Sequence, residues 1–179
     1  MTDYTIDWPE YRASLPVETV SPQRYDAVAG AWRDCDNAQA GDSPDALRVI
    51  SFNTWFKDFR RDLRDPALVD LLRQCNADLV LLQEVTEELF EQLLDATWVR
   101  DSYAVVRSPF SRSSIPKHGL MLLSRWPIAC ATAYPLPTHM GRRLLVAEVT
   151  IGSAVLVAAT THLESMDNAP IRAEQLAFI

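Results

Sequence analysis

Residues 79–85 read Leu79-Val80-Leu81-Leu82-Gln83-Glu84-Val85, an uninterrupted aliphatic run that ends in a carboxylate. Such a run is typical of a strand that is buried on both faces, and Glu84 stands where that strand should stop. A carboxylate in this position can cap the following helix or simply reach water. It can also be a hard oxygen ligand, which suits Mg²⁺ or Mn²⁺ in a crevice that also holds a phosphate.

Two further strands, predicted to be buried in the same way, are each expected to release one polar side chain at the carboxyl end. Residues 47–52 run into Asn53, and residues 154–161 run into His162. Ligands of α/β sheets bind in the crevice outside such strand ends, so we expect Asn53, Glu84 and His162 to meet in one site. Each has a structural alternative, because asparagine after a strand is a common turn residue and a lone histidine is often only hydrogen-bonded within the fold.

The composition describes a globular chain of about one domain. Its 179 residues are 48% hydrophobic, which is enough for a core. The net charge of −7 argues against a protein that coats nucleic acid non-specifically, although an enzyme that touches a few phosphates remains compatible. The three scattered cysteines fit neither a disulfide framework nor a CxxC metal site, which indicates a reducing compartment. No signal peptide or membrane-spanning run is found, so we expect a cytoplasmic protein without a membrane partner.

Two regions are predicted along the chain. Residues 1–46, interrupted by proline and glycine, are expected to be an N-terminal extension and linker, and residues 47–179 the organised domain. Within the extension one short helix is predicted after Ser21-Pro22, from the spacing of Tyr25, Val28, Ala29 and Trp32. We expect Trp8 and Trp32 to anchor the extension on the main body.

The organised region begins with alternating strands and helices, which indicates an α/β fold. A helix is predicted to start at Asp65-Pro66 with a stripe of Leu68, Leu71, Leu72 and Cys75, and Thr86 is predicted to cap a second helix that buries Leu89, Phe90, Leu93 and Leu94. Short apolar runs then predict five strands, at residues 103–107, 119–124, 128–134, 143–150 and 154–161, with Gly152-Ser153 as the last hairpin turn. A final helix is predicted to open at Asn168-Ala169-Pro170.

The loop after Asn53 is rich in aromatic and basic groups. Trp55 and Phe56 could stack on a base or an aromatic leaving group, or could close the rim of the core. The cations that could steer phosphates, or could simply be solvated, are Arg60, Arg61, Arg112, Lys117, Arg142 and Arg143. His118 and His139 fall in predicted loops and are assigned to solvent or to the edge of the substrate site.

Three stretches resemble successive motifs of the endonuclease/exonuclease/phosphatase superfamily, and they occur in family order. They are Val49-Ile50-Ser51-Phe52-Asn53, Leu81-Leu82-Gln83-Glu84-Val85 and Thr161-His162-Leu163-Glu164-Ser165. The last of these, together with Met140-Gly141-Arg142-Arg143-Leu144-Leu145, is most similar to the tyrosyl-DNA phosphodiesterase 2-like branch. The resemblance implies a four-layer αββα sandwich, of which residues 47–179 would form the N-terminal part.

The resemblance also implies a hydrolase activity and a role for each matched residue. A water would attack the phosphorus of a phosphodiester, such as one at a DNA 5′ end, while Mg²⁺ or Mn²⁺ on Glu84 stabilises the developing charge. Asn53 would bind the phosphate or orient the nucleophile, and His162 would hydrogen-bond the phosphate oxygens or the leaving group. Ser165 would be a further phosphate contact, and we assign Trp55 and Arg142 to substrate binding.

The family's later motifs, Gly-Asp-x-Asn and a terminal Ser-Asp-His segment, have no counterpart after Ser165. No general base can therefore be named. We expect a C-terminally truncated domain with impaired turnover and one sheet face or edge left uncovered. The alternatives are a non-catalytic fragment that binds a phosphorylated ligand, and a phosphoesterase that acts on a phospholipid or inositol phosphate.

Overall fold

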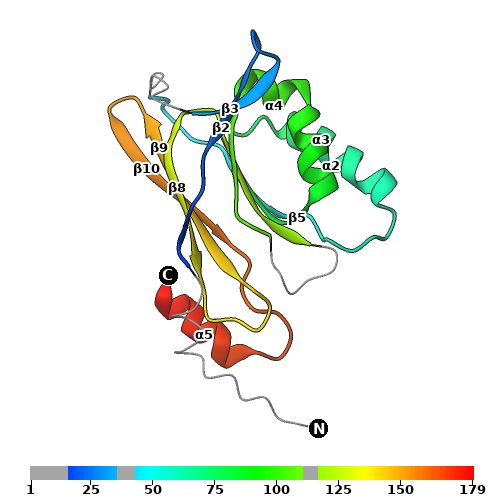
Figure 1. The fold of residues 1–179 in the computed structure, drawn as a ribbon, viewed down its shortest axis with the longest axis vertical. Helices are drawn as coiled ribbons and strands as arrows, with labels where there is room; N and C mark the ends of the chain where they lie inside the picture. The colour runs from blue at the N-terminus through cyan, green and yellow to red at the C-terminus, as the bar shows by residue number, and fades with distance from the viewer. Residues whose placement is uncertain (1–15, 36–42, 111–116) are drawn as a thin grey trace.

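Two stacked β-sheets, with helices packed on one of them, make up the fold (Figure 1). The computed structural model describes residues 16–35, 43–110 and 117–179. The strand orders are β3-β2-β6-β7-β5-β4 in one sheet and β1-β8-β9-β10 in the other. The predicted α/β class and sandwich architecture are therefore confirmed.

The larger sheet carries the single parallel pairing among the described strands. It contains β2 (Gln23–Asp26), β3 (Ala31–Asp34), β4 (Val49–Asn53), β5 (Leu79–Thr86), β6 (Ala104–Arg107) and β7 (His118–Ser124). Strands β4 and β5 run parallel, and the helix α2 (Arg61–Cys75) connects them. This connection is the crossover that a parallel pair requires, and it brings the carboxyl ends of β4 and β5 to the same edge.

The smaller sheet is antiparallel and contains the last three of the five strands predicted between residues 103 and 161, whereas the first two belong to the larger sheet. It contains β1 (Glu18–Thr19), β8 (Ile128–Pro135), β9 (Arg143–Ile151) and β10 (Ala154–Thr161). The β9–β10 hairpin pairs Ile151 with Ala154. Gly152 in its turn has φ +58°, a conformation that favours glycine.

The prediction of a helix after Ser21-Pro22 is wrong, because β2 and β3 form a hairpin there. Asp26 accepts hydrogen bonds from the backbone N–H groups of Val28 and Ala29, which stabilises a turn in place of a helix. Tyr25 then faces Trp32 across the strands, with ring centroids 5.6 Å apart. Trp32 packs against the core as predicted, whereas Trp8 lies outside the described residues.

These N-terminal strands are hydrogen-bonded to the rest of the fold. Strand β1 pairs with β8, and β2 pairs with β6. Both sheets therefore include residues from the region predicted as an extension and linker. The division of the chain at residue 46 stays a prediction.

Three of the described helices were predicted and one was not. Besides α2 they are α3 (Glu87–Asp95), α4 (Thr97–Ser102) and α5 (Ala169–Phe178). Helix α4 was not predicted, and Leu71 of the predicted α2 stripe is exposed. Thr86 caps α3 by accepting a hydrogen bond from the Leu89 N–H, and the four predicted apolar residues of α3 are buried, both as expected. Helix α2 begins at Arg61 instead of Asp65-Pro66, because the Arg60 carbonyl already accepts from the backbone of Leu63 and Arg64.

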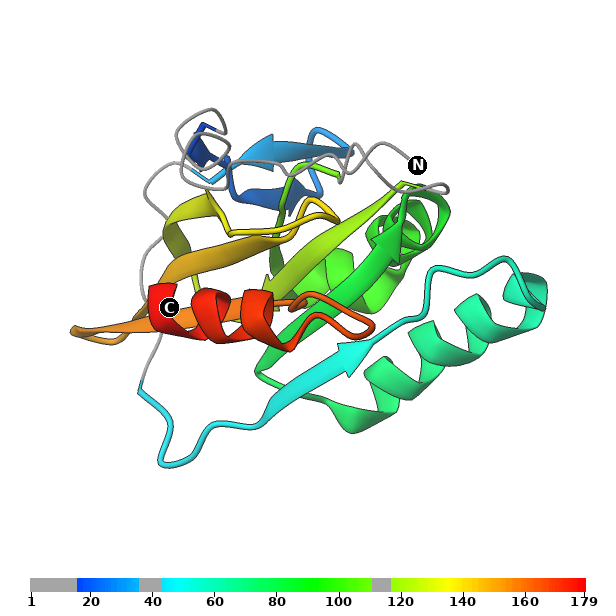
Figure 2. The ribbon, with the colours of Figure 1, turned by 90° about the horizontal axis from the view of Figure 1, so that it is seen from below.

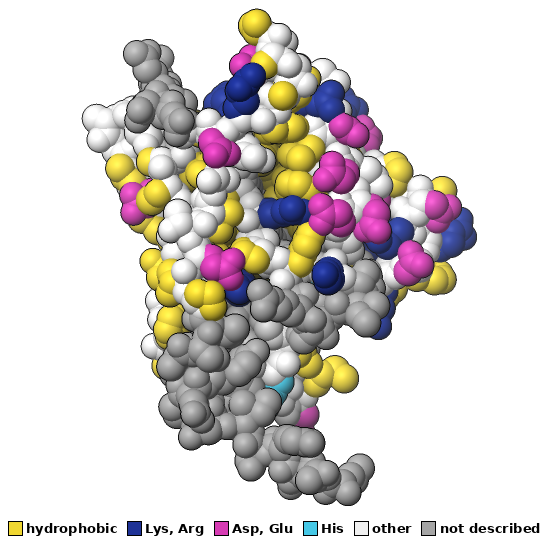
Figure 3. Space-filling view, viewed as in Figure 1, with side chains coloured by type: hydrophobic (Ala, Val, Ile, Leu, Met, Phe, Trp, Pro, Cys, Tyr) yellow, Lys and Arg dark blue, Asp and Glu magenta, His cyan; other side chains and the backbone are white. Residues whose placement is uncertain are grey.

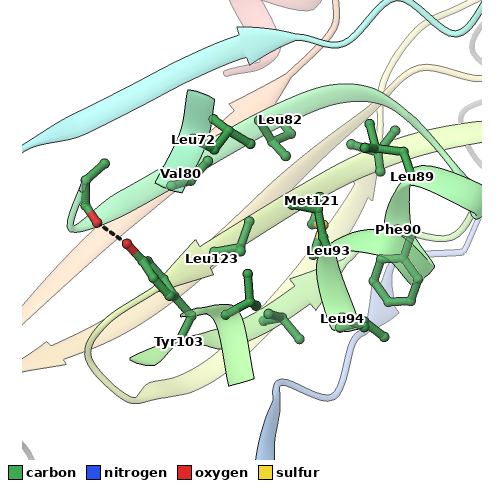
Figure 4. Packing of buried hydrophobic residues seen from close by; sticks show 14 residues of the cluster. Leu72, Val80, Leu82, Leu89, Phe90, Leu93, Leu94, Tyr103, Met121 and Leu123 are labelled. Carbon is green, nitrogen blue, oxygen red and sulfur yellow. Dashed lines mark hydrogen bonds between the residues drawn. The ribbon is translucent and has the colours of Figure 1, made fainter. Parts of the chain in front are cut away.

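Alternate residues of β5 enter two different cores, which explains its uninterrupted aliphatic sequence. Val80 and Leu82 pack with helices α2 and α3 on the outer face, while Leu79 and Leu81 face the second sheet. Figure 4 shows the outer core, where the Tyr103 hydroxyl donates to the carbonyl of Ala77. Each fully buried leucine contributes about 2 kcal/mol of hydrophobic stabilisation.

Each sheet ends in an exposed strand, β4 in one and β10 in the other (Figure 2). We expected all three motif strands to be buried on both faces, and this is correct for β5 only. The exposed apolar residues of these two strands are Val49, Phe52, Val155 and Val157. Because β4 and β10 each have a neighbour on one side only, their residues stay accessible.

The surface carries mixed charge. On the face shown in Figure 3, acidic and basic side chains are interspersed over helices α2 to α4. The three cysteines form no disulfide with one another, as predicted. Among the described helices, none combines the length and apolar character needed to cross a membrane.

Candidate active site

Glu84 sits on a β-bulge inside strand β5. Leu82 pairs with Met121 and Val85 pairs with Gly119, so Gln83 and Glu84 together stand opposite the single residue Leu120. Glu84 has φ +61°, which costs about 1–2 kcal/mol for a residue other than glycine. Strand β5 continues to Thr86, so the carboxylate leaves the strand at the bulge and not at the strand end as predicted.

The Glu84 carboxylate is buried and held by two donors, one at the end of β4 and one in the loop that follows it. The amide Nδ2 of Asn53 donates to Oε1 over 3.1 Å, and the backbone N–H of Phe56 donates to Oε2 over 2.9 Å. The other end of the Asn53 amide, Oδ1, accepts from the backbone N–H of Trp55. Asn53 therefore acts both as a turn residue and as a partner of Glu84, and one of its two amide hydrogens is still available.

Thr54 and Gln83 hold the bulge in place, although neither was predicted to have a role. The hydroxyl of Thr54 lies 3.1 Å from the carbonyl oxygen of Gln83 and 2.9 Å from that of Glu84. The side-chain amide of Gln83 donates to Ser51 on β4 and to Thr160 on β10. These contacts tie the bulge to both sheets. The Gln83-Glu84 motif was visible in the sequence, but nothing local indicated what Gln83 binds.

His162 approaches the same carboxylate from the other sheet. Its Nδ1 lies 3.4 Å from Glu84 Oε1 and 2.7 Å from Nη1 of Arg142. A guanidinium has donors only, so Nδ1 is the acceptor and the hydrogen of a neutral imidazole is on Nε2. The pKa of His162 is lowered mainly by burial and then by the charge of Arg142, with Glu84 opposing the shift, which agrees with a neutral ring.

Arg142 joins His162 to Ser165. Its Nη2 donates to the Ser165 hydroxyl oxygen over 2.8 Å, and its side chain is buried. Burial outweighs the nearby carboxylates of Glu164 and Glu84 and lowers the pKa of Arg142. Its Nε is a buried donor without a partner, so the predicted alternative of a solvated cation does not hold for this residue.

A buried carboxylate, Glu164, positions the loop that carries Arg142. It accepts from the Thr138 hydroxyl over 2.6 Å and from the backbone N–H of His139 over 2.9 Å. The same Thr138 oxygen accepts from the backbone N–H groups of Met140 and Arg142. Both lone pairs of that hydroxyl are used, so its hydrogen must point to Glu164, which is therefore an acceptor.

A small cavity of about 20 Å³ lies among Glu84, His118, Arg142 and His162. His118 was assigned to a loop, at solvent or at the edge of the substrate site. The loop and the solvent alternative are wrong, because His118 is the first residue of β7 and is buried, whereas its place in the lining of this cavity agrees with the other alternative. Its ring stacks on Phe56 at 4.3 Å and 11°. Phe56 is therefore engaged within the fold. His139 is exposed, as predicted.

The remaining predicted substrate residues are distributed differently. Trp55 is 49% exposed beside the site. Arg61 pairs with Asp65 and Glu88, and Arg143 pairs with Glu18, so both are engaged within the fold. Arg60 and Lys117 are exposed, and Arg112 lies outside the described residues.

The oxygen atoms that could ligate a metal at the site fit a cation held by one carboxylate. In the described part of the chain, no group of three or more histidine, cysteine, aspartate or glutamate residues could hold a metal. Each oxygen of Glu84 accepts one hydrogen bond and keeps a second lone pair. Mg²⁺ often uses one or two carboxylates together with waters and substrate phosphates, so Glu84 is a suitable single protein ligand.

Comparison with known proteins relates this geometry to one family. Residues 50–179 match the sequence profile of the Endonuclease/Exonuclease/phosphatase family. No curated protein sequence gives a significant match.

Several solved structures share the fold. Humanized D. rerio TDP2 carrying 14 mutations is 27% identical, with a TM-score of 0.64 over 74% of this chain and 57% of that chain. D. rerio TDP2 complexed with single strand DNA product is 27% identical, with a TM-score of 0.63 over 74% and 52%. ANGEL2, a 2′,3′-cyclic phosphatase, shares the fold at 17% identity, with a TM-score of 0.58 over 73% and 45%. The present chain thus spans between 40% and 57% of the length of these and other TDP2 chains that it matches.

Proposed function

The chain belongs to the endonuclease/exonuclease/phosphatase family, and we propose that Asn53, Glu84 and His162 form its site for hydrolysing a phosphodiester. The observation that supports this most is their convergence on one oxygen. Glu84 Oε1 lies 3.1 Å from Asn53 Nδ2 and 3.4 Å from His162 Nδ1, although the three residues come from three strands. This is the crevice in which such sheets bind ligands.

Glu84 would hold the divalent cation, Mg²⁺ or Mn²⁺, through the lone pairs that Asn53 and Phe56 leave open. A bound divalent cation stabilises the negative charge that develops on phosphoryl oxygens during in-line attack by water. The bulge would serve this purpose by fixing the direction of the carboxylate before substrate binds.

The donors around the cavity would bind the phosphate. The buried Nε of Arg142 has no partner, and the hydrogen on His162 Nε2 is not used by the Arg142 contact. The Ser165 hydroxyl accepts from Arg142, so its own hydrogen remains available to a phosphate oxygen. Such positioned donors are the main source of transition-state stabilisation in phosphoryl transfer.

Turnover by the 179-residue chain is expected to be slow. Taking a proton from the attacking water requires a base with a free lone pair, and His162 Nδ1 is occupied by Arg142. The lone pairs that Asn53 and Phe56 leave open on Glu84 would be taken by the cation. The described residues at the site therefore provide binding and charge stabilisation without an evident general base.

A DNA 5′ end is the substrate that we propose first. The support is the likeness to TDP2, whose D. rerio form was solved with a single strand DNA product. The described residues of the site can contact one phosphate group and do not form a broad basic face. Such a site suits the end of a DNA strand better than a long duplex. A phospholipid or inositol phosphate is the competing substrate.

The test is release of product from a 5′-phosphotyrosyl oligonucleotide in Mg²⁺, with and without EDTA, with a lipid headgroup phosphodiester as competitor. We expect slow, chelator-sensitive hydrolysis that falls about tenfold or more in Glu84→Gln. The matched control is Glu91→Gln, an exposed glutamate of α3, which should behave as wild type. Hydrolysis unaffected by EDTA or by Glu84→Gln would contradict the proposal. Binding without any hydrolysis would identify a phosphate-binding module.

A further inference from the structure

The loop after β4 holds one tryptophan in an unfavourable conformation at the surface. Trp55 has φ +59°, in the left-handed region that residues other than glycine avoid, yet its side chain is 49% exposed. Neither burial of the indole nor a glycine-like turn explains this conformation. Strained residues outside ordinary turns concentrate at functional sites, where surrounding contacts hold them.

Most of those surrounding contacts come from Arg64 of α2. Its Nη1 donates to the carbonyls of Lys57 and Phe59, and its Nη2 donates to those of Thr54 and Trp55, over 2.7–3.0 Å. A planar guanidinium is suited to this task because its donors point in fixed directions. The same group lies 4.5 Å from the centre of the Trp55 ring. Arg64 therefore fixes both the loop backbone and the plane of the indole.

About half of the Trp55 side chain is accessible to a ligand. Arg64 covers one face of the indole, and Phe59 borders the ring, with centroids 6.3 Å apart and planes tilted by 49°. Phe59 is itself 66% exposed. Two exposed rings with a cation behind one of them form a preorganised aromatic surface, which we call the Trp55–Phe59 surface.

This surface adjoins the candidate site through the backbone. The N–H of Trp55 donates to Asn53 Oδ1, and the next N–H, that of Phe56, donates to Glu84 Oε2. A ligand whose phosphate lies at Glu84 could place a flat group on the indole only if the two are joined by a short linker. A nucleotide has this arrangement.

We propose that the Trp55–Phe59 surface stacks one unpaired nucleobase of a single-stranded nucleic acid whose phosphate occupies the Glu84 site. The proposal rests on the proposed function and specifies its substrate class. A nucleobase fits better than an apolar peptide segment, because the available contact is one flat aromatic face and not a groove. Base stacking on such a face tolerates any sequence.

The experiment measures binding of two fluorescein-labelled phosphorothioate strands of equal length and charge, one with bases and one abasic, by fluorescence anisotropy in Mg²⁺. Wild type should bind the strand with bases about tenfold more tightly, as expected for one stacked base. Trp55→Leu should abolish this preference, while Trp55→Phe should keep most of it. The matched control is Leu63→Ala, which removes a neighbouring side chain that is 55% exposed but has no aromatic face.

Equal affinity of wild type for both strands, or a preference that survives Trp55→Leu, would overturn the proposal. So would a Trp55→Leu variant that binds both strands normally but loses affinity for a phosphotyrosyl peptide, because the surface would then be a peptide site. The abasic strand reports the phosphate site alone. If Asn53→Ala and Glu84→Gln left its affinity unchanged, the proposed function would fail, and that result is distinct from failure of the stacking surface.

Discussion

Two loops present the candidate site, and side chains of opposite charge hold them. Residues 54–60, after β4, are held by Arg64, which donates to four backbone carbonyls. Residues 136–142, between β8 and β9, are held by Glu164, which accepts from Thr138 and His139. In both cases a charge from a later part of the chain fixes the backbone that carries a site residue.

The two loops differ in burial. Glu164 is 2% exposed, whereas Arg64 is half-buried and lies below an exposed aromatic surface. Leaving a hydrogen-bonding group unsatisfied beside a buried charge costs more free energy than leaving one unsatisfied where water can reach it. The contacts of Glu164 should therefore matter mainly for the stability of the fold. Those of Arg64 should matter mainly for binding a ligand.

The largest effect is expected for Glu164→Gln. The amide oxygen of glutamine can replace one acceptor, but its NH₂ group would face the Thr138 hydroxyl or the His139 N–H, both of which are donors. We expect a loss of about 2–3 kcal/mol in the free energy of unfolding, because hydrogen bonds to buried charged groups contribute about 1.5–3 kcal/mol. Urea denaturation measures it.

Asp167→Asn is the control for that variant, since Asp167 is an exposed acid in the segment between β10 and α5 that also contains Glu164. It should change stability by less than about 0.5 kcal/mol. Equal effects of the two variants would remove the distinction between the loops.

Arg64→Lys should have an intermediate effect on stability. One ammonium group cannot reach the four carbonyls that two guanidinium nitrogens bind, so we expect a loss of about 1–2 kcal/mol. The same variant should lower the preference for base-bearing strands, because the indole loses its support. Arg73→Lys, on the exposed side of the same helix and paired with Asp70, should be nearly neutral in both assays. A stable Arg64→Lys protein with unchanged base preference would show that the loop does not need Arg64.

The smallest effect is expected for Thr54→Val, which tests how the first loop supports the bulge. The substitution keeps the shape of the side chain and removes the hydroxyl that contacts the Gln83 and Glu84 carbonyls. We expect a loss of about 1 kcal/mol, the net contribution of one hydrogen bond. Differential scanning calorimetry would follow it as a fall in Tm. Thr54→Ser should restore the wild-type value, and failure to do so would assign the effect to packing.

Helices, strands and turns that are determined by their own local residues were predictable from the sequence. The aliphatic run of β5, the capped α3 and the β9–β10 hairpin are examples, because local periodicity and turn residues determine them. The β2–β3 hairpin was missed, since Tyr25 and Trp32 fit both helical spacing and a cross-strand pair. The exposure of β4 was missed as well, because burial depends on which strands lie beside it.

The candidate site was predictable as a set of residues but not as a geometry. Asn53, Glu84 and His162 could be selected because each follows or ends an apolar run. The positive φ of Glu84 could not, because it results from the unequal pairing with β7 and from the Thr54 hydroxyl. Arg64 was missed as a site residue, since its partners are carbonyls of the loop backbone, and the stacking of His118 on Phe56 was missed because the two residues lie far apart in the chain.

Asn53, Glu84 and His162 are proposed to surround one cation and its phosphate. Paramagnetic broadening by Mn²⁺, in the presence of inorganic phosphate, tests this arrangement most directly by NMR. We predict that substoichiometric Mn²⁺ broadens the Asn53 side-chain amide, the Phe56 N–H and the His162 ring together, and that Glu84→Gln prevents this. The indole N–H of Trp98, which packs on Tyr103 near the start of β5, should stay sharp. Broadening that misses these three groups, or that persists in Glu84→Gln, would contradict the account.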